Sequence, residues 1–151
     1  MIQKIISGAQ TGADRAGIDA AIESGVDYGG WLPDGRKAED GIVPQKYTKL
    51  QEIIGGNYPE RTEQNVLDSD GTVIFGYGKL TTGSALTRKL ANQHKRPYLH
   101  IDLDIIKEPV PVIKDWIIER NIKVLNIAGR KASKAPGIYD KVKDIIKQVL
   151  R

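Results

Sequence analysis

Short apolar runs alternate with helical patterns along the chain. The runs have few polar interruptions, as is typical of parallel strands that are covered on both faces of a sheet. We expect strands at residues 4–7, 28–32, 71–75, 97–101 and 123–127, and helices at residues 14–24, 61–67, 84–94, 112–120 and 138–150. Strands separated by helices form βαβ units. The sequence therefore predicts an α/β fold, Rossmann-like and doubly wound, with a mainly parallel sheet of about five strands and helices on both faces.

Residues 34–59 interrupt this alternation. They are polar, rich in Gly and Pro, and long for a connection, so we expect them to be functional or partly structured. The chain has no internal repeat, low-complexity tract or linker, and residues 1–151 are expected to form a single ligand-binding domain. Thr62 is a candidate N-cap of its helix. The apolar face formed by Ile113, Trp116 and Ile117 belongs either to the core or to a subunit contact.

The charge of the chain is mildly basic, with 23 Lys and Arg against 19 Asp and Glu and a net charge of +4. We expect the cations of the last third to be solvent-exposed and solubilising; they are Lys131, Lys134, Lys141, Lys143, Lys147 and Arg151. A surface that binds nucleic acid needs a denser basic stripe with interleaved aromatic residues. Nucleic acid is therefore not an expected partner.

The chain contains no cysteine, which excludes disulfides, thiolate metal ligands and cysteine nucleophiles. His94 and His100 are not spaced as a metal pair on one face, so we predict no metal site. No apolar run approaches the roughly 20 residues needed to cross a bilayer, and the chain enters its first strand without a signal-peptide pattern. We expect a cytoplasmic protein with no membrane partner.

A glycine-rich turn follows the first strand and opens the first helix. Glycines permit close backbone approach, and the first amides of a helix, with its partial positive charge, suit a phosphate. The plain alternative is a tight turn at a crowded strand end. The candidate phosphate-binding residues are Gly8, Gln10, Thr11, Gly12, Asp14 and Arg15. This interpretation requires that the helix amides face an open cleft and are free to bind an anion.

A second glycine-rich turn, at residues 76–87, follows the strand at 71–75 and is dense in hydroxyl groups. Its candidate ligand-binding residues are Thr82, Gly83, Ser84 and Thr87, although Thr82 or Ser84 could instead only cap the helix. Ligands of doubly wound folds bind at the carboxyl ends of the strands. We therefore expect the two turns, on neighbouring strands, to face each other across one crevice.

The segment at residues 30–41 places charged residues and an aromatic residue after the second strand. Arg36 and Lys37 are candidates for holding a second anionic group. Trp31 either stacks on a planar ring or belongs to the core. The run at residues 133–139 forms either a wall of the same crevice or only a loop that leads into the last helix.

Five motifs, taken together, resemble those of the molybdenum carrier family, relatives of the algal molybdenum cofactor carrier protein. They are SGAQTGADR, GGWLPDGRKAEDG, RTEQNVLDSDGTVIF, LTTGSALT and NIAGRKASKAPGIY, and they follow the family's order over nearly the whole chain. The resemblance implies a small anionic ligand, namely the molybdenum cofactor (molybdopterin) or a related phosphate-bearing pterin or nucleotide. It also implies a homo-oligomer, and a dimer or tetramer agrees with base rates. Without cysteine, the metal would arrive on the cofactor's own sulfurs or as an oxyanion.

The wider superfamily includes the cytokinin-activating phosphoribohydrolases, often called lysine-decarboxylase-like, which the chain resembles around Arg61 and residues 83–87. Thr87 stands where these enzymes carry a general acid/base Glu, and a hydroxyl group cannot supply that proton chemistry near neutral pH. The resemblance thus favours binding without catalysis, and we assign no catalytic residue.

Two alternatives to a carrier stay open. One is a nucleotide-processing hydrolase, such as a nucleoside-monophosphate phosphoribohydrolase, with an acid/base among Asp14, Glu39, Asp40 and Asp70. The other is a nucleotide-sensing module within a larger complex.

Overall fold

A six-stranded parallel sheet forms the centre of the computed structural model, which describes residues 1–151. Its strands lie in the order β5-β2-β1-β8-β6-β7, and every pair of neighbours is parallel. Their bounds are β1 Lys4–Ile6, β2 Asp27–Leu32, β5 Leu50–Glu52, β6 Gly71–Gly76, β7 Tyr98–Asp102 and β8 Val124–Gly129. The expected strands are all present, and the sheet gains β5, which sequence patterning did not predict.

The order of the strands changes direction in the middle of the sheet. From β1 the chain runs through β2 to β5 at one edge, and from β6 it runs to β7 at the other edge. The last strand, β8, pairs with both β1 and β6 and so lies between them. The two glycine-rich turns follow β1 and β6, which are separated by β8. The prediction that these turns follow neighbouring strands is therefore wrong. In doubly wound folds, such a change of direction marks the ligand-binding crevice.

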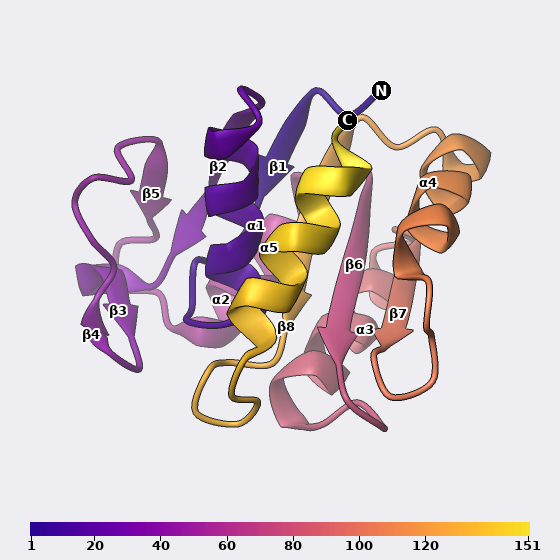
Figure 1. The fold of residues 1–151 in the computed structure, drawn as a ribbon. Coiled ribbons are helices and arrows are strands. Elements are labelled where there is room, and N and C mark those ends of the chain that lie inside the picture. The colour runs from indigo at the N-terminus through magenta and orange to yellow at the C-terminus, as the bar shows by residue number, and fades with distance from the viewer.

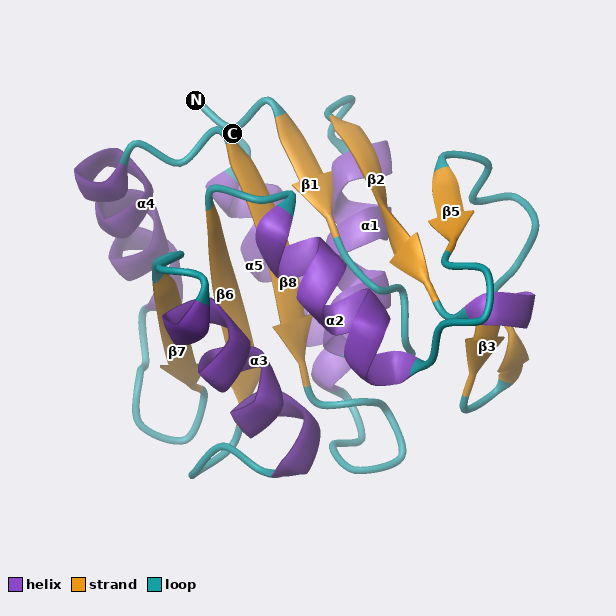
Figure 2. Ribbon diagram, turned by 180° about the vertical axis from the view of Figure 1, so that it is seen from behind, coloured by secondary structure: helices purple, strands orange, loops and turns teal.

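Helices cover both faces of the sheet, as expected. α1 (Ala13–Glu23), α4 (Pro109–Arg120) and α5 (Ile138–Val149) pack on the face toward the viewer in Figure 1. α2 (Tyr58–Leu67) and α3 (Thr82–Gln93) cover the opposite face, seen in Figure 2. Both termini lie near the amino ends of the strands, and the loops that follow β6 and β8 lie at the opposite end.

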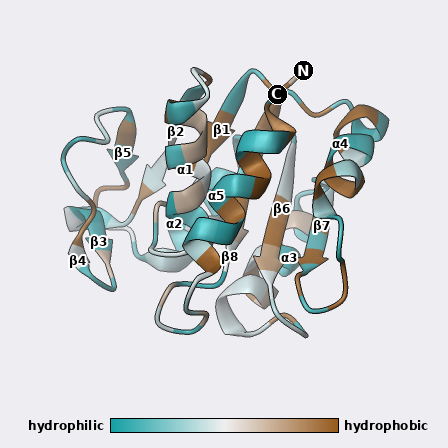
Figure 3. Ribbon diagram, in the orientation of Figure 1, coloured by the Kyte–Doolittle hydropathy of each residue, from teal (hydrophilic) through white to brown (hydrophobic).

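The core lies mainly between the sheet and α1, α4 and α5. Val142, Ile145, Ile146 and Val149 are buried along one side of α5, and Figure 3 shows the outward side of that helix as hydrophilic. The face formed by Ile113, Trp116 and Ile117 is buried in the same cluster. Of the two alternatives for this face, it therefore belongs to the core and not to a subunit contact. None of the five helices has the length and apolar character that crossing a bilayer demands.

The stretch at residues 34–59 is partly structured. A short 3₁₀ turn, η1 (Asp34–Arg36), leads into a small hairpin of β3 (Lys37–Ala38) and β4 (Gly41–Ile42), before β5 joins the edge of the sheet. The helix expected at 61–67 begins earlier, with Asn57 as its N-cap. Thr62 is not the cap, since its hydroxyl donates to the Tyr58 carbonyl within the helix.

The turn before α1 packs closely against the loop that follows β8. The Ala13 amide donates to the Arg130 carbonyl at 3.1 Å. Gly12 has a φ of +82°, and a Cβ built there would lie 2.4 Å from that carbonyl oxygen and 2.8 Å from the Ala132 nitrogen. Only glycine fits this crossing, because both the backbone conformation and the approaching main chain exclude a side chain.

Gly12→Ala is expected to lower the free energy of unfolding by about 3 kcal/mol, because backbone strain and a main-chain collision add together. Gly25→Ala is the matched control, since Gly25 also has a positive φ (+70°) but has no neighbouring atom within 4 Å. That control should lose only about 1 kcal/mol. Urea unfolding of both variants measures the difference, and equal losses would contradict the close packing at Gly12.

Candidate functional site

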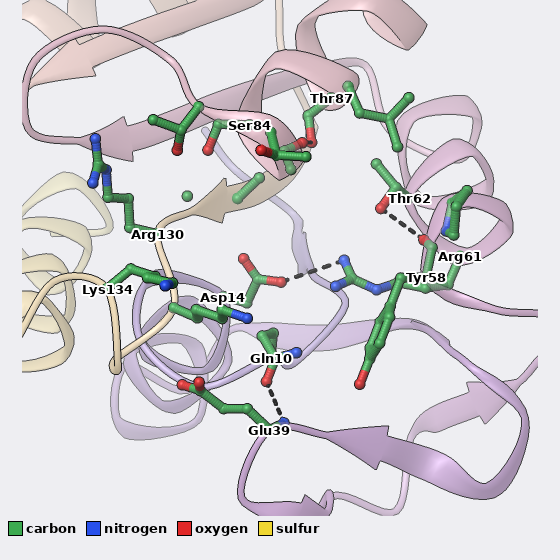
Figure 4. Close-up of a pocket in the computed structure, with 18 residues that line it drawn as sticks. Gln10, Asp14, Glu39, Tyr58, Arg61, Thr62, Ser84, Thr87, Arg130 and Lys134 are labelled. Atoms are coloured by element: carbon green, nitrogen blue, oxygen red, sulfur yellow. Dashed lines mark hydrogen bonds and ion pairs between the residues drawn. The ribbon is translucent and has the colours of Figure 1, made fainter.

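A cavity of about 790 Å³ opens at the carboxyl ends of β1, β8 and β6. Figure 4 shows the side chains that line it. They come from the turn before α1, from the hairpin of β3 and β4, from the first turns of α2 and α3, and from the loop after β8. The lining residues are Gln10, Asp14, Glu39, Tyr58, Pro59, Arg61, Thr62, Thr81, Thr82, Gly83, Ser84, Leu86, Thr87, Ala128, Gly129, Arg130, Lys131 and Lys134. The second glycine-rich turn is thus part of a shared cavity, as predicted.

The first turn of α3 presents unused donors to this cavity. The Ala85 amide donates to the Thr81 carbonyl at 2.7 Å, and the amides of Thr82, Gly83 and Ser84, which precede it, have no partner within the chain. No side chain caps the helix, so neither Thr82 nor Ser84 has the capping role that was the alternative. The first amides of a helix lack intrahelical partners and carry its partial positive charge. The start of α3 can therefore bind an anion by donating hydrogen bonds from these amides.

Four cations surround the same cavity: Arg61, Arg130, Lys131 and Lys134. Arg130 is held by a hydrogen bond of 2.9 Å from its Nη2 to the Tyr77 carbonyl. The ammonium groups of Lys131 and Lys134 make no ion pair within 4 Å. Lys134 is exposed, as we expect of a surface cation, and Lys131 is half-buried, but both also line the cavity.

Asp14 places a buried carboxyl group at the cavity. Its residue is 4% exposed, and Arg61 Nη1 lies 3.5 Å from its Oδ2. Burial raises the pKa of Asp14 from 3.8 to about 6, against the opposing influence of Arg61, of Arg15 and of the nearby backbone amides of Gln10 and Gly129. Burial outweighs the attraction of the guanidinium because removing a carboxylate from water is costly.

The amides at the start of α1 are only partly free: those of Gly12 and Asp14 have no partner within the chain, but others near them are bound, so the expectation of a set of free anion donors holds only in part. The Ala13 amide is bound to the Arg130 carbonyl, and the Thr11 amide donates to Gln10 Oε1 at 3.1 Å. The Arg15 amide donates to the Gln10 carbonyl at 3.0 Å. The protein's own oxygen atoms therefore take up three of the donors that we had assigned to a phosphate.

Four candidates of the first turn have internal contacts instead of a place in the large cavity. A Cβ on Gly8 would lie 2.3 Å from Arg61 Nη1, so this glycine makes room for the Arg61 guanidinium. The Thr11 hydroxyl donates to Glu39 and accepts from the Ala132 amide at 3.1 Å. Arg15 pairs with Asp40 at 2.6 Å and donates to the Ala9 carbonyl. The fourth, Gly12, meets the loop after β8.

The candidates after the second strand also lie elsewhere. The Arg36 guanidinium is buried and donates to the carbonyls of Val43 and Pro44, at 3.1 and 2.9 Å. Lys37 is exposed and is not among the lining residues. The Trp31 indole donates to Asp68 at 2.7 Å and likewise does not reach the cavity. These residues therefore organise the edge of the sheet around β2 and β5.

Several lining residues were not candidates from the sequence. Tyr58 and Pro59 precede the predicted start of their helix, Thr62 is predicted only as its N-cap, and Lys134 is predicted as a surface charge. One signal in the sequence pointed to such residues: the run at 133–139 was predicted to form either a wall of the crevice or only a loop. Lys134 of this run lines the cavity. No group of three or more His, Asp or Glu side chains is arranged to ligate a metal ion.

Comparisons with known proteins agree with the resemblance read from the motifs. A family model described as the circularly permutated YpsA SLOG family matches residues 5–150. The fold is similar to the crystal structure of a protein named putative molybdenum carrier protein, from Syntrophus aciditrophicus, with a TM-score of 0.96 and 52% sequence identity. That match covers 99% of this chain and 96% of the other. No curated protein matches the chain.

The elevated pKa of Asp14 predicts a specific pH dependence of stability. Because the folded pKa (about 6) exceeds the unfolded value (3.8), the unfolded carboxyl group releases its proton first as the pH rises. The contribution of Asp14 to stability therefore falls between about pH 4 and pH 6, by about 3 kcal/mol in total.

Asp14→Asn removes this titration. Urea unfolding from pH 4 to pH 8 should show the difference between the wild type and Asp14→Asn shifting by about 3 kcal/mol in favour of the variant. The variant leaves Arg61 without its carboxylate partner at every pH in this range. The free energy lost in this way is constant and does not change the pH dependence of stability. Stability curves that run parallel would show that the folded pKa of Asp14 is unshifted.

Proposed function

Because the chain belongs to the circularly permutated YpsA SLOG family, we propose that it binds a phosphate-bearing pterin or nucleotide and acts as a carrier of the molybdenum cofactor. The observation that carries this proposal is the meeting, at one cavity, of the unpaired first amides of α3 with the cations Arg61, Arg130, Lys131 and Lys134. The similar protein from Syntrophus aciditrophicus bears the name of a molybdenum carrier, which favours the pterin over other ligands.

The phosphate of the ligand is placed at the start of α3. There the amides of Thr82, Gly83 and Ser84 would donate to its oxygens, as helix N-termini do in other phosphate sites. The Ser84 hydroxyl adds a further donor, whereas the Thr87 hydroxyl is already bound to the Gly83 carbonyl at 3.1 Å. Arg130 and the two lysines would neutralise the remaining charge.

The size and chemistry of the cavity suit such a ligand. A volume of about 790 Å³ falls within the range of about 300–1,000 Å³ that is usual for small-molecule sites. Since no cluster of His, Asp or Glu is arranged to hold a metal ion, the molybdenum would be cargo carried on the sulfurs of the pterin, and the protein would hold the organic part.

Binding is tested by adding molybdopterin, AMP and molybdate separately to the purified chain. A phosphate-bearing ligand at a hundred times its Kd should raise the melting temperature by roughly 5–10 °C. Molybdate alone lacks the ring and should have a smaller effect. If no phosphate-bearing ligand shifts the melting temperature, the proposal is wrong.

A charge variant locates the site. Replacing both Lys131 and Lys134 with Ala should weaken binding of the phosphate ligand at least about tenfold, because each removed cation costs on the order of 1 kcal/mol in a partly exposed site. Lys141→Ala is the matched control, since Lys141 is exposed on α5 and outside the cavity. Titration calorimetry compares the two, and equal affinities would place the phosphate elsewhere.

A second candidate function, a nucleotide hydrolase, is favoured by one observation. Asp14 is a carboxyl group beside the cavity whose pKa of about 6 suits proton transfer near neutral pH. Of the other acids considered from the sequence, Glu39 also lines the cavity. Asp40 pairs with Arg15, and Asp70 accepts from the amides of Lys123 and Val124 at the far end of β8.

Release of ribose 5-phosphate from nucleoside monophosphates tests this candidate. If the chain is a hydrolase, Asp14→Asn should lower the rate by at least about a hundredfold. Asp40→Asn should leave the rate nearly unchanged, because Asp40 does not line the cavity. The absence of release from any nucleoside monophosphate would leave the carrier as the function of the site.

A further inference from the structure

Tyr58 is the one aromatic residue among those that line the cavity. It lies at the first turn of α2 and is 41% exposed. It belongs to none of the hydrophobic clusters of the fold. A large aromatic side chain that no core position requires and that faces a cavity offers a flat surface for stacking.

The Tyr58 ring is held from within the protein. The Arg61 guanidinium carbon lies 5.6 Å from the centroid of the ring, within the range of a cation–π contact. The same guanidinium extends to Asp14 at its other end, and its Nε is buried without a hydrogen-bond partner. Arg61 therefore connects the buried carboxyl group with the exposed ring and restricts the position of both.

Gln10 presents a donor to the same cavity. Its Oε1 accepts from the Glu39 amide at 2.8 Å and from the Thr11 amide at 3.1 Å. Two amide donors on one side-chain atom identify that atom as the oxygen. The Nε2 group has no partner within the chain, so its hydrogens are left for an acceptor in the cavity.

The aromatic residue and the free cations lie on different sides of the cavity. Figure 4 shows Arg130 and Lys134 on one side, and Tyr58 and Arg61 on the other. A ligand that fills the cavity would thus meet the donors of α3 and the β8 loop with one part, and Tyr58 with another. A free oxyanion or a sugar phosphate would use only the first of these.

We propose that Tyr58 and Gln10 form a ring-recognition subsite, in which a planar heterocycle stacks on Tyr58 and its oxo group accepts a hydrogen bond from Gln10 Nε2. This inference rests on the proposed function and narrows its ligand class to monophosphates of oxo-substituted heterocycles, such as pterins and guanine. The subsite selects the ring, and the start of α3 selects the phosphate.

Calorimetric titration of the full chain with GMP and with ribose 5-phosphate tests the subsite. GMP carries the 2-amino-4-oxo pyrimidine ring that pterins share, and ribose 5-phosphate carries the phosphate without a ring. The wild type should bind GMP at least about tenfold more tightly, since stacking on one aromatic side chain supplies that much affinity. Tyr58→Ala should weaken GMP binding to the level of ribose 5-phosphate and leave ribose 5-phosphate binding unchanged.

Tyr58→Phe keeps the ring and should retain the preference for GMP, which separates stacking from any effect of the hydroxyl group. Because Tyr58 is exposed and outside the core, Tyr58→Ala should stay folded, with its melting temperature lowered by no more than about 4 °C through the loss of the Arg61 contact. Equal affinity of the wild type for the two ligands, or an equal loss for both in Tyr58→Ala, overturns the subsite while the phosphate site stands. If neither ligand binds, the proposed function fails and this inference fails with it.

Discussion

The carboxylate of Asp14 at the start of α1 is the constraint on which the rest of the site depends. It is buried at the first turn of that helix, beside the backbone amides of Gln10 and Gly129, which favour its charged form. Its charge is countered by Arg61, 3.5 Å away, and Gly8 is small enough to leave room for that guanidinium. The buried pair therefore joins α1 to α2 at the cavity.

The first turn of α3 presents three unpaired amides to the cavity. The two glycine-rich turns differ because the amides of Thr11, Ala13 and Arg15 in the first turn are bound within the chain, whereas those of Thr82, Gly83 and Ser84 in the second turn are unpaired. The second turn is flanked by cations from the loop after β8, so positive potential collects at one end of the cavity. The other end holds Tyr58, and the cavity is therefore suited to a ligand that has an anionic end and a planar end.

The central place of β8 explains why the last third of the chain contributes so much to the site. Because β8 lies between β1 and β6, the loop that follows it emerges at the middle of the crevice. Arg130, Lys131 and Lys134 reach the cavity for this reason. Had β8 been an edge strand, the same lysines would have been the solvated surface charges that their composition suggests.

The sequence by itself determined the α/β class, the five main strands, the helices on both faces and the participation of residues 82–87 in the cavity, because apolar periodicity and glycine-rich turns are local signals. It did not determine β5 or the order of the strands, since β pairing joins residues far apart in the chain. Nor did it show that Arg36 and Arg15 are used internally, or that Tyr58 and Lys134 line the cavity. Whether a donor is free or occupied depends on which oxygen atoms the tertiary structure brings to it, as the Ala13 amide and the Arg130 carbonyl demonstrate.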